Sequence, residues 1–385
     1  MTGFASTRPS ARRRVLAATA VAVLSVAGCG GDDDEAPEAR SAESTVGEVS
    51  AELQSIIDAA NEEGSLELAS AASFGQTDAG EALVDAFEGY YPGLDIDVRS
   101  TPGASQGETA NKVREEVLAG QPAHTDVLGV TAGAVGSLVG DDVLLTDIAW
   151  DALPDVQPDM VDSVYDATVE VQRFIQVVVY NTDAVAEDEV PTTTEDLLSP
   201  QFDGRLGTTP FLGGFDILLE EWGLDRTKEY MTAFAGQLGG QVGGGSDVNP
   251  LVTGQFDLIA FLPGPGAADV LKADGAPIDY TILSDAAMTY QLVLTVPTTA
   301  AHPNAAQLWI NFVASPTGQA LLREHAYMDT PLVEGSLTGE QMAEAEADGA
   351  EFVDADVAWY AELDQEEYGR NAQEIIDIVR NGTGG

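Results

Sequence analysis

The sequence predicts an α/β fold of two halves joined by two long crossing strands, with helices added at the C-terminus. Two stretches carry this prediction, because both alternate along their length and are rich in β-branched residues: 169–182 and 288–296. On each side of residues 169–182, short strands and helices follow one another, which favours a mostly parallel sheet covered by helices. This arrangement is typical of a hinged protein whose halves enclose a ligand.

The first half is predicted from helical spacing and strand alternation. Leu53, Ile56, Ile57 and Ala60 recur at helical spacing, and Gly64 is a typical helix end. The expected helices are 51–63, 78–90, 109–118 and one that follows residue 133, and the expected strands are 66–70, 94–100 and 126–130.

The second half repeats this pattern after a turn at Asn181 that ends the first crossing strand. The expected helices are 194–198 (as a helix start), 215–222, 228–236, 249–253 and 267–273, and the expected strands are 205–209 and 257–261. After the return crossing strand, Pro303 opens an amphipathic helix over 305–313, and a further helix follows it. The acidic segment from residue 335 is expected to be helical, with a last helix near 373–379.

The composition excludes one class of function. The chain has 385 residues, of which 44% are hydrophobic, so it has room for two domains and a substantial core. Its formal net charge is −49, from 65 acidic and 16 basic residues. Such a charge argues against nucleic-acid binding, because few basic side chains remain to neutralise phosphates.

The same charge predicts a protein adapted to high salt, and the alternative is an acidic protein from an ordinary source. Repulsion between like charges destabilises a compact state, and in molar salt the Debye length falls to ~3 Å. We therefore expect the melting temperature to rise between low and molar potassium chloride. A melting temperature that does not rise over this range would contradict the prediction.

Residues 1–28 have the order of an export signal. An arginine-rich start precedes an uncharged, mostly apolar run over 15–28, which is too short to span a hydrocarbon layer of ~30 Å. The run ends in Val-Ala-Gly-Cys29, which resembles the lipobox of a lipoprotein, and the pair Arg12-Arg13 also resembles a twin-arginine signal. Cys29 is the only cysteine, so disulfides and cysteine redox pairs are excluded, and residues 29–50 are expected to form a disordered acidic tether.

Five turns with small, polar or glycine residues follow predicted strands and open helices at once: 70–75, 100–107, 208–214, 243–247 and 263–266. In open α/β sheets, ligands bind outside the carboxyl ends of strands, where helix N-termini offer free N–H groups. Ordinary capping is the better explanation of any single turn, but five of them in a two-lobed chain favour a binding cleft. The ligand-binding candidates are Ser70, Ser73, Thr101, Ser105, Thr131, Arg173, Gly213, Gly214, Phe215, Ser246, Asp247 and Pro263.

Arg173 is a rare basic residue in a predicted hinge strand, and two interpretations stay open for it. It pairs either with an anionic ligand or with Glu170 or another buried acid. The adjacent tyrosines Tyr90 and Tyr91 raise the idea of a tyrosinate iron site, but they end a helix away from the predicted cleft, which favours packing.

Motifs for catalysis are absent from the sequence. The three histidines, His124, His302 and His325, stand in unlike contexts, and no zinc-protease, serine-hydrolase or P-loop motif occurs. We therefore expect no catalytic residue, no metal site and no cofactor.

Several stretches resemble the extracellular solute-binding proteins of ABC importers, in the group that takes iron, thiamine, polyamines or phosphonates. The matching stretches are EEGSLELAS (62–70), FEGYYPGLDIDV (87–98), VREEVLAGQPAHTDVLG (113–129), VVVYNTDAV (177–185), EDLLSPQFDGRLG (195–207) and NAAQLWINFVASPTGQALL (304–322). The resemblance spans residues 51–328 and implies the two-lobed fold of type II periplasmic binding proteins. Iron-binding members use adjacent tyrosines of the second lobe, whereas the corresponding stretch here, 257–270, has none.

The resemblance implies a receptor that delivers a captured solute to an ABC permease and its ATPase. Serine, threonine and backbone amides on the predicted turns suit a small polar or anionic organic solute. We expect a monomer outside the cell, held by lipid at the outer face of the cytoplasmic membrane. The alternative functions are a two-lobed enzyme and a sensor without transport. The expected organisation is a signal peptide (1–28), a tether (29–50), lobe 1 (51–168 with 297–334), hinge strands (169–182 and 288–296), lobe 2 (183–287) and a helical tail (335–385).

Overall fold

The computed structural model describes residues 45–69, 78–101, 105–209, 215–243 and 247–382. All of them belong to one unit of the chain, Ala42–Gly385. The strands are β1 Ser65–Ala69, β2 Asp97–Thr101, β3 Leu128–Thr131, β4 Val169–Asn181, β5 Leu206–Thr208, β6 Leu238–Gln241, β7 Leu258–Pro263, β8 Ile278–Thr281, β9 Met288–Thr295 and β10 Val353–Ala355.

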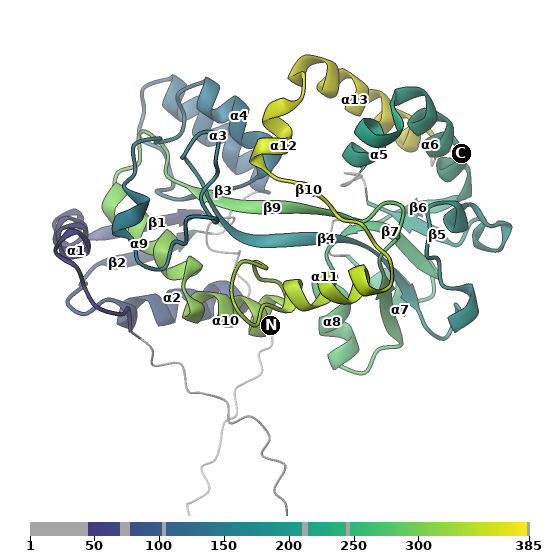
Figure 1. The fold of residues 1–385 in the computed structure, drawn as a ribbon, viewed down its shortest axis with the longest axis horizontal. Helices are drawn as coiled ribbons and strands as arrows, with labels where there is room; N and C mark the ends of the chain where they lie inside the picture. The colour runs from purple at the N-terminus through teal and green to yellow at the C-terminus, as the bar shows by residue number, and fades with distance from the viewer. Residues whose placement is uncertain (1–44, 70–77, 102–104, 210–214, 244–246, 383–385) are drawn as a thin grey trace, which may run out of the picture. The chain divides into compact units, whose positions relative to one another are not determined.

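The α-helices surround these strands (Figure 1). They are α1 Ala51–Glu63, α2 Asp78–Tyr90, α3 Gln106–Leu118, α4 Ala132–Gly140, α5 Phe215–Trp222, α6 Leu224–Gln237, α7 Asn249–Val252, α8 Gly266–Ala273, α9 Pro303–Ala314, α10 Pro316–Ala326, α11 Leu337–Ala347, α12 Val357–Glu362 and α13 Gln365–Gly382. Among the described residues, no helix combines the length and the apolar character that crossing a bilayer requires.

The two crossing strands are confirmed, and β4 is the strand that both halves share. Its first part, Val169 to Ile175, pairs antiparallel with β9. Its second part, from Gln176 to Asn181, pairs antiparallel with β7 and β8. The strands of the two halves therefore connect through one strand, and the partners change at its centre.

Each half has its own hydrophobic core. In the first half, Phe87, Trp309 and Phe312 form a group of tilted and edge-to-face ring contacts, with centroids 5.2–5.9 Å apart, and all three are fully buried. In the second half, Phe234 and Phe261 make an edge-to-face contact at 5.2 Å. The cores are separate, and β4 is the strand that pairs with strands of both halves.

Three short strands were not predicted, namely β6, β8 and β10. The four residues of β8 carry little pattern of their own, and they form a strand because β4 offers an open edge to pair with. The stretch 194–198, expected to start a helix, forms a 3-10 turn over Glu195–Leu198. The turn cannot extend because Ser199-Pro200 follows, and a residue before proline is disfavoured in helical conformation.

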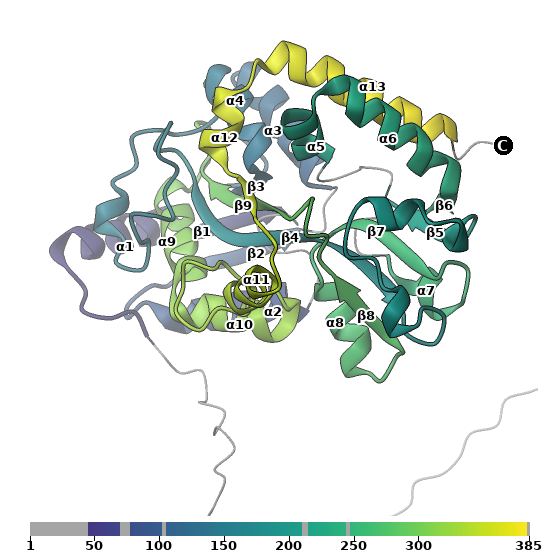
Figure 2. The same cartoon turned by 45° about the vertical axis from the view of Figure 1, so that its right-hand side comes forward.

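The C-terminal segment contributes to both halves, which the sequence did not indicate. It is mostly helical as predicted, but β10 pairs parallel with β9 through Val353–Ala355. Helix α12 packs on α4 of the first half, and α13 packs along α6 of the second half (Figure 2). Ile375 and Val379 of α13 are fully buried in the second core.

Candidate functional site

Each half contains a set of parallel strands whose carboxyl ends lie at a common edge. Strands β1 and β2 are parallel, with Ala69 opposite Thr101, and an isolated parallel bridge between Leu68 and Val127 aligns the chain that leads into β3. Strand β5 lies parallel to both β6 and β7. In parallel strands the carboxyl ends meet at one edge, so each half presents one carboxyl edge.

The register of the crossing strands shows where these two edges lie. Thr131, the last residue of β3, pairs with Leu292 of β9, which in turn pairs with Gln172 of β4. Pro263, the last residue of β7, pairs with Gln176 of β4. Both strands run toward the centre of β4, so their carboxyl ends face each other. Four residue steps along β4 lead from Gln172 to Gln176, which corresponds to about 13 Å at ~3.3 Å per residue.

Thr131 and Ser105 differ in what their hydroxyl groups do. Ser105 closes a capping box at the start of α3: its hydroxyl accepts a hydrogen bond from the Glu108 amide, and its own backbone amide donates one to the Glu108 carboxylate. The Ser105 hydroxyl also donates to this carboxylate. Thr131 precedes α4, yet its side chain makes no capping hydrogen bond. Of the two hydroxyl groups, that of Thr131 is therefore the one left available to a ligand.

Arg173 lies at the centre of β4 and forms ion pairs with two carboxylates. Its Nε and Nη2 donate to Glu170 at 3.0 and 2.5 Å, and its Nη1 lies 2.7 Å from Asp354 Oδ2 of β10. Thr330 and Gln291 also donate to the Glu170 carboxylate. Burial raises the pKa of Glu170, against the opposing effect of Arg173. In the structure Arg173 thus balances the charge of acidic side chains of its own chain, which is one of the two interpretations of this residue. A contact between Arg173 and a ligand stays a prediction.

The other described candidates are placed as follows. Thr101 is exposed at the end of β2, and Pro263 is partly buried at the end of β7. Phe215 is 5% exposed and belongs to the core of the second half. The Asp247 carboxylate accepts a hydrogen bond from the Gly243 amide at 3.3 Å. Cys29 and five ligand candidates lie outside the described residues: Ser70, Ser73, Gly213, Gly214 and Ser246.

The structure adds residues that the sequence did not single out. Phe174 of β4 and Tyr290 of β9 form a tilted ring pair at 5.1 Å beside the centre of the crossing strands. Phe261 of β7 adopts φ +62°, a conformation that is costly for an aromatic residue and often marks functional sites. No signal in the sequence identifies these residues, because their positions follow from strand register.

Tyr90 and Tyr91 are buried, as the packing interpretation predicted. The Tyr91 hydroxyl donates to the Leu308 carbonyl, and the Tyr90 hydroxyl donates to Asp155. Burial raises the pKa of both tyrosines, so neither is suited to bind iron as a tyrosinate. Within the described ranges, no group of three histidine, cysteine or acidic residues is arranged to hold a metal ion.

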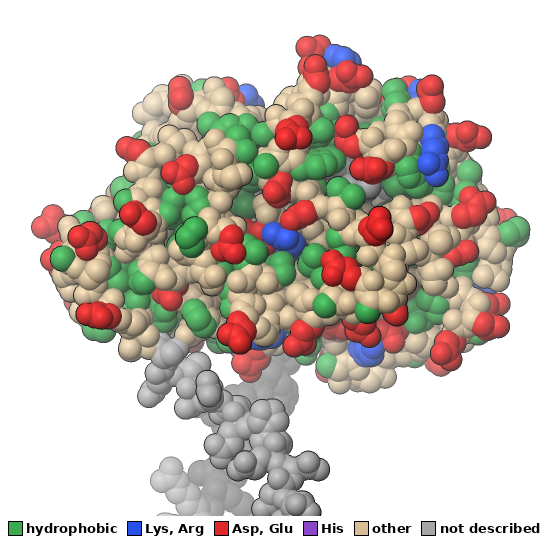
Figure 3. Space-filling view, viewed as in Figure 1, with side chains coloured by type: hydrophobic (Ala, Val, Ile, Leu, Met, Phe, Trp, Pro, Cys, Tyr) green, Lys and Arg blue, Asp and Glu red, His purple; other side chains and the backbone are tan. Residues whose placement is uncertain are grey.

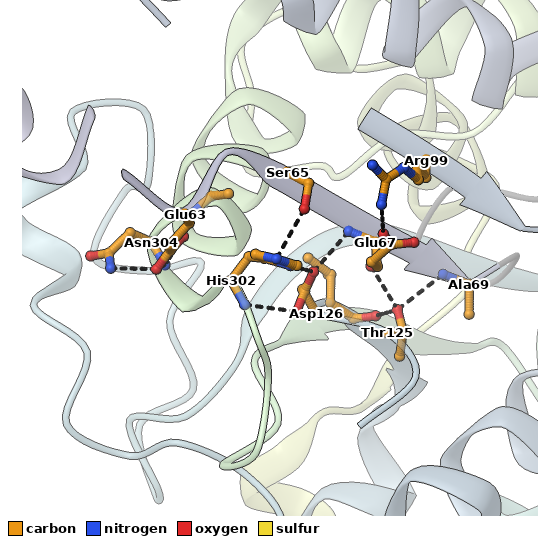
Figure 4. Close-up of polar contacts among 11 residues, drawn as sticks. Glu63, Ser65, Glu67, Ala69, Arg99, Thr125, Asp126, His302 and Asn304 are labelled. Carbon is orange, nitrogen blue, oxygen red and sulfur yellow. Dashed lines mark hydrogen bonds and ion pairs between the residues drawn. The ribbon is translucent and has the colours of Figure 1, made fainter. Parts of the chain in front are cut away.

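A Ser–His–Asp chain of hydrogen bonds occurs in the first half (Figure 4). Ser65 Oγ lies 2.9 Å from His302 Nε2, and His302 Nδ1 lies 2.7 Å from Asp126 Oδ2. Ser65 is the first residue of β1 and Asp126 precedes β3, so the chain lies at the amino ends of these strands, away from the carboxyl edge. The Glu67 and His302 amides also donate to Asp126, which makes the group a joint between β1, β3 and α9.

Solved structures with the same fold share little sequence with this chain. A substrate-binding protein of an ABC transporter from Agrobacterium tumefaciens matches with a TM-score of 0.67 and 18% identity, over 82% of this chain and 95% of that one. Iron-bound HitA from Pseudomonas aeruginosa matches with a TM-score of 0.60 and 19% identity, over 83% and 99%. AfuA from Actinobacillus pleuropneumoniae, with fructose-6-phosphate bound, matches with a TM-score of 0.60 and 15% identity, over 82% and 99%.

These structural matches support the two-lobed fold of type II periplasmic binding proteins. No curated protein sequence matches the chain. The family model described as bacterial extracellular solute-binding protein matches residues 82–350, which is more than half of the chain. The chain therefore belongs to the family of bacterial extracellular solute-binding proteins.

Proposed function

We propose that this protein captures a small polar or anionic organic solute between its two carboxyl edges and delivers it to an ABC permease and ATPase. The observation that carries the proposal is the register that brings Thr131 and Pro263 toward the centre of β4 from opposite sides. Structural neighbours hold iron, fructose-6-phosphate or agropinic acid, so the fold accepts solutes of different chemistry.

In this proposal β4 and β9 act as the hinge. Lobe 1 comprises residues 51–168 with 297–334, lobe 2 comprises 183–287, and ligand binding closes them by bending at the centre of the crossing strands. Bending at the centre of β4 would leave both hydrophobic cores intact, because the two cores are separate. In this proposal the protein acts as a monomer. It also acts without covalent chemistry, which the family description as a solute-binding protein supports.

The proposal is tested by a thermal-shift screen against phosphonates, polyamines, thiamine and sugars, with each hit also assayed for turnover. A ligand at 100 times its dissociation constant stabilises the folded state by about 2.7 kcal/mol. We expect a melting-temperature shift without turnover. Turnover of a hit would contradict the receptor and favour the enzyme.

Thr131→Val is expected to weaken binding of such a hit roughly two- to tenfold, because a ligand hydrogen bond contributes about 0.5–1.5 kcal/mol. The melting temperature without ligand should stay unchanged, since the hydroxyl makes no capping bond. Thr253→Val is the matched control, because Thr253 ends α7 on an exposed surface. Equal affinity of the Thr131 variant and the control, measured by calorimetry, would remove Thr131 from the site.

We also propose that Cys29 carries the lipid that holds the protein at the outer face of the cytoplasmic membrane. The order of arginines, apolar run and cysteine supports this proposal. Cys29→Ser is expected to move the protein from the membrane fraction to the soluble fraction, measured by immunoblot after fractionation. A variant that stays with the membrane would contradict lipid attachment at this residue.

A further inference from the structure

We infer that the solute held between the two carboxyl edges carries no net negative charge, and is an organic cation or an uncharged polar compound. The inference rests on the proposed function, because it concerns the same site. It narrows the class of solute from the positions of the lysine and arginine side chains and from the partners that each of them binds.

The lysines and arginines of residues 45–382 all belong to the described part of the chain. The four inner stretches without a description, 70–77, 102–104, 210–214 and 244–246, contain neither residue type. Every lysine and arginine in residues 45–382 can therefore be considered.

The described basic side chains are engaged with partners of their own chain. The ion pairs are Arg99 with Glu67 and Asp97, Lys112 with Glu116, Arg114 with Asp141, Arg173 with Glu170 and Asp354, Arg205 with Asp257, Lys228 with Glu374, Lys272 with Asp279, Arg323 with Asp329, and Arg370 with Glu366. Arg226 lies over the Trp222 ring at 4.2 Å, and Arg380 lies in the last turn of α13 and also has a partner.

Arg173 is the basic residue whose strand position is closest to both edges. Its guanidinium faces the carboxylates of Glu170 and Asp354, and its side chain is only 11% exposed. With two acids to one base, this cluster keeps a net negative charge when all three are ionised. To neutralise an anionic ligand, Arg173 would have to give up the buried Glu170 or the partly exposed Asp354, which would leave that carboxylate without its charge partner.

Helix N-termini are the second common means of binding an anion, and most of those at the edges already have an acid in the first turn. These acids are Asp78 and Glu81 in α2, Glu108 in α3 and Asp269 in α8. Hydrogen bonds from Ser105 lower the pKa of Glu108, so this carboxylate is ionised at the start of α3. Helix α4, which follows Thr131, and the four-residue helix α7 have no acid in their first turn.

The electrostatic field of the whole protein also disfavours an anionic solute. On the face drawn in Figure 3, acidic side chains are spread over both halves and basic ones are few. With a formal net charge of −49, the protein repels anions and attracts cations over a distance of the order of the Debye length. A cationic or uncharged solute avoids this repulsion, and serine, threonine and backbone groups can hydrogen-bond either kind.

The test is a retention experiment with a mixed pool of defined probes. The purified protein is equilibrated with putrescine, spermidine, thiamine, maltose, citrate, fructose 6-phosphate, phosphonoacetate and sulfate, passed through gel filtration, and examined by native mass spectrometry. We expect it to retain one of the first four compounds. Sulfate is included because it tests the N-terminus of α4.

The outcomes separate this inference from the proposed function. Retention of citrate, fructose 6-phosphate, phosphonoacetate or sulfate would overturn the inference about the charge of the solute, but it would still agree with the proposed receptor function. Retention of none of the eight compounds contradicts both.

The retained compound then distinguishes the two kinds of solute. For a cation, Asp78→Asn is expected to weaken binding roughly two- to fivefold at low salt, as removal of one exposed charge does, and Asp58→Asn on α1 is the matched control. The dissociation constant should also rise with potassium chloride. For an uncharged solute, both variants bind as the wild type does. Tighter binding by the Asp78 variant than by the control would indicate a negatively charged ligand and overturn the inference.

Discussion

Replacing Arg173 with alanine is expected to destabilise the protein by about 3–5 kcal/mol, as breaking a buried ion pair generally does. The reason is that Glu170 is only 1% exposed and would lose the charge that balances its carboxylate. Thr330 and Gln291 would still donate hydrogen bonds to Glu170, but neither carries a charge. Urea denaturation at pH 7, followed by tryptophan fluorescence, measures the change in the free energy of unfolding.

Arg370→Ala is the matched control for this prediction. Arg370 also forms an ion pair within its own element, with Glu366 one turn earlier on α13, but both side chains are more than half exposed. Exposed pairs contribute between 0 and about 1 kcal/mol, so the control should unfold close to the wild type. If both variants lose the same small amount, the cluster around Arg173 contributes no more than a surface pair.

The pH dependence of the Arg173 variant provides a second measurement. Burial raises the pKa of Glu170 in the folded protein, and loss of Arg173 removes an effect that opposes this rise. A carboxyl whose pKa is higher in the folded than in the unfolded state binds its proton more tightly when folded. Stability therefore falls as pH rises from the unfolded pKa through the folded pKa. We expect acidification from pH 7 toward pH 5 to recover part of the loss, and Glu170→Gln in the variant to recover it at pH 7.

Replacing Ile375 with alanine is expected to cost about 2–5 kcal/mol, the usual range for a buried isoleucine that leaves a cavity. Ile375 is fully buried in the core of the second half although it stands outside the family-matched residues 82–350. On the same helix, Glu374 Oε1 lies 2.5 Å from Lys228 Nζ of α6. Thermal and urea denaturation should both show the loss.

Gln373→Ala is the control on the same helix, because the Gln373 side chain is exposed and, within the described residues, donates a hydrogen bond only to Asp377 one turn later. It should change the free energy of unfolding by less than about 0.5 kcal/mol. An Ile375 variant as stable as this control would mean that α13 is a dispensable appendage. The expected loss would instead make the C-terminal helix a structural part of the second half.

The sequence predicted well where a local pattern decides the structure. The alternation over residues 169–182 identified β4, whose observed bounds are Val169–Asn181. The bounds of α2 and α5 agree with the prediction at both ends. Both helices combine an apolar stripe with clear boundaries, so neighbouring residues contain the required information.

Prediction failed where a distant partner decides the structure. Strand β10 has three residues, and it is a strand only because Met288–Tyr290 of β9 pair with it. The role of α13 depends on the surface of α6, more than a hundred residues earlier in the chain. A short segment has too few positions to show a period, and its pairing energy comes from elsewhere in the fold.

The same division applies to the candidate site. The sequence by itself determined the α/β class, the crossing strands and the excess of acidic residues, because composition and local periodicity fix them. Four of the five predicted turns lie partly or wholly outside the described residues. Only the tertiary structure decided that Arg173 is held by Glu170 and Asp354, that Ser105 is used as a cap and that Phe215 is buried in a core. Whether a polar side chain is available to a ligand depends on the partners that folding brings to it, and those partners come from remote parts of the chain.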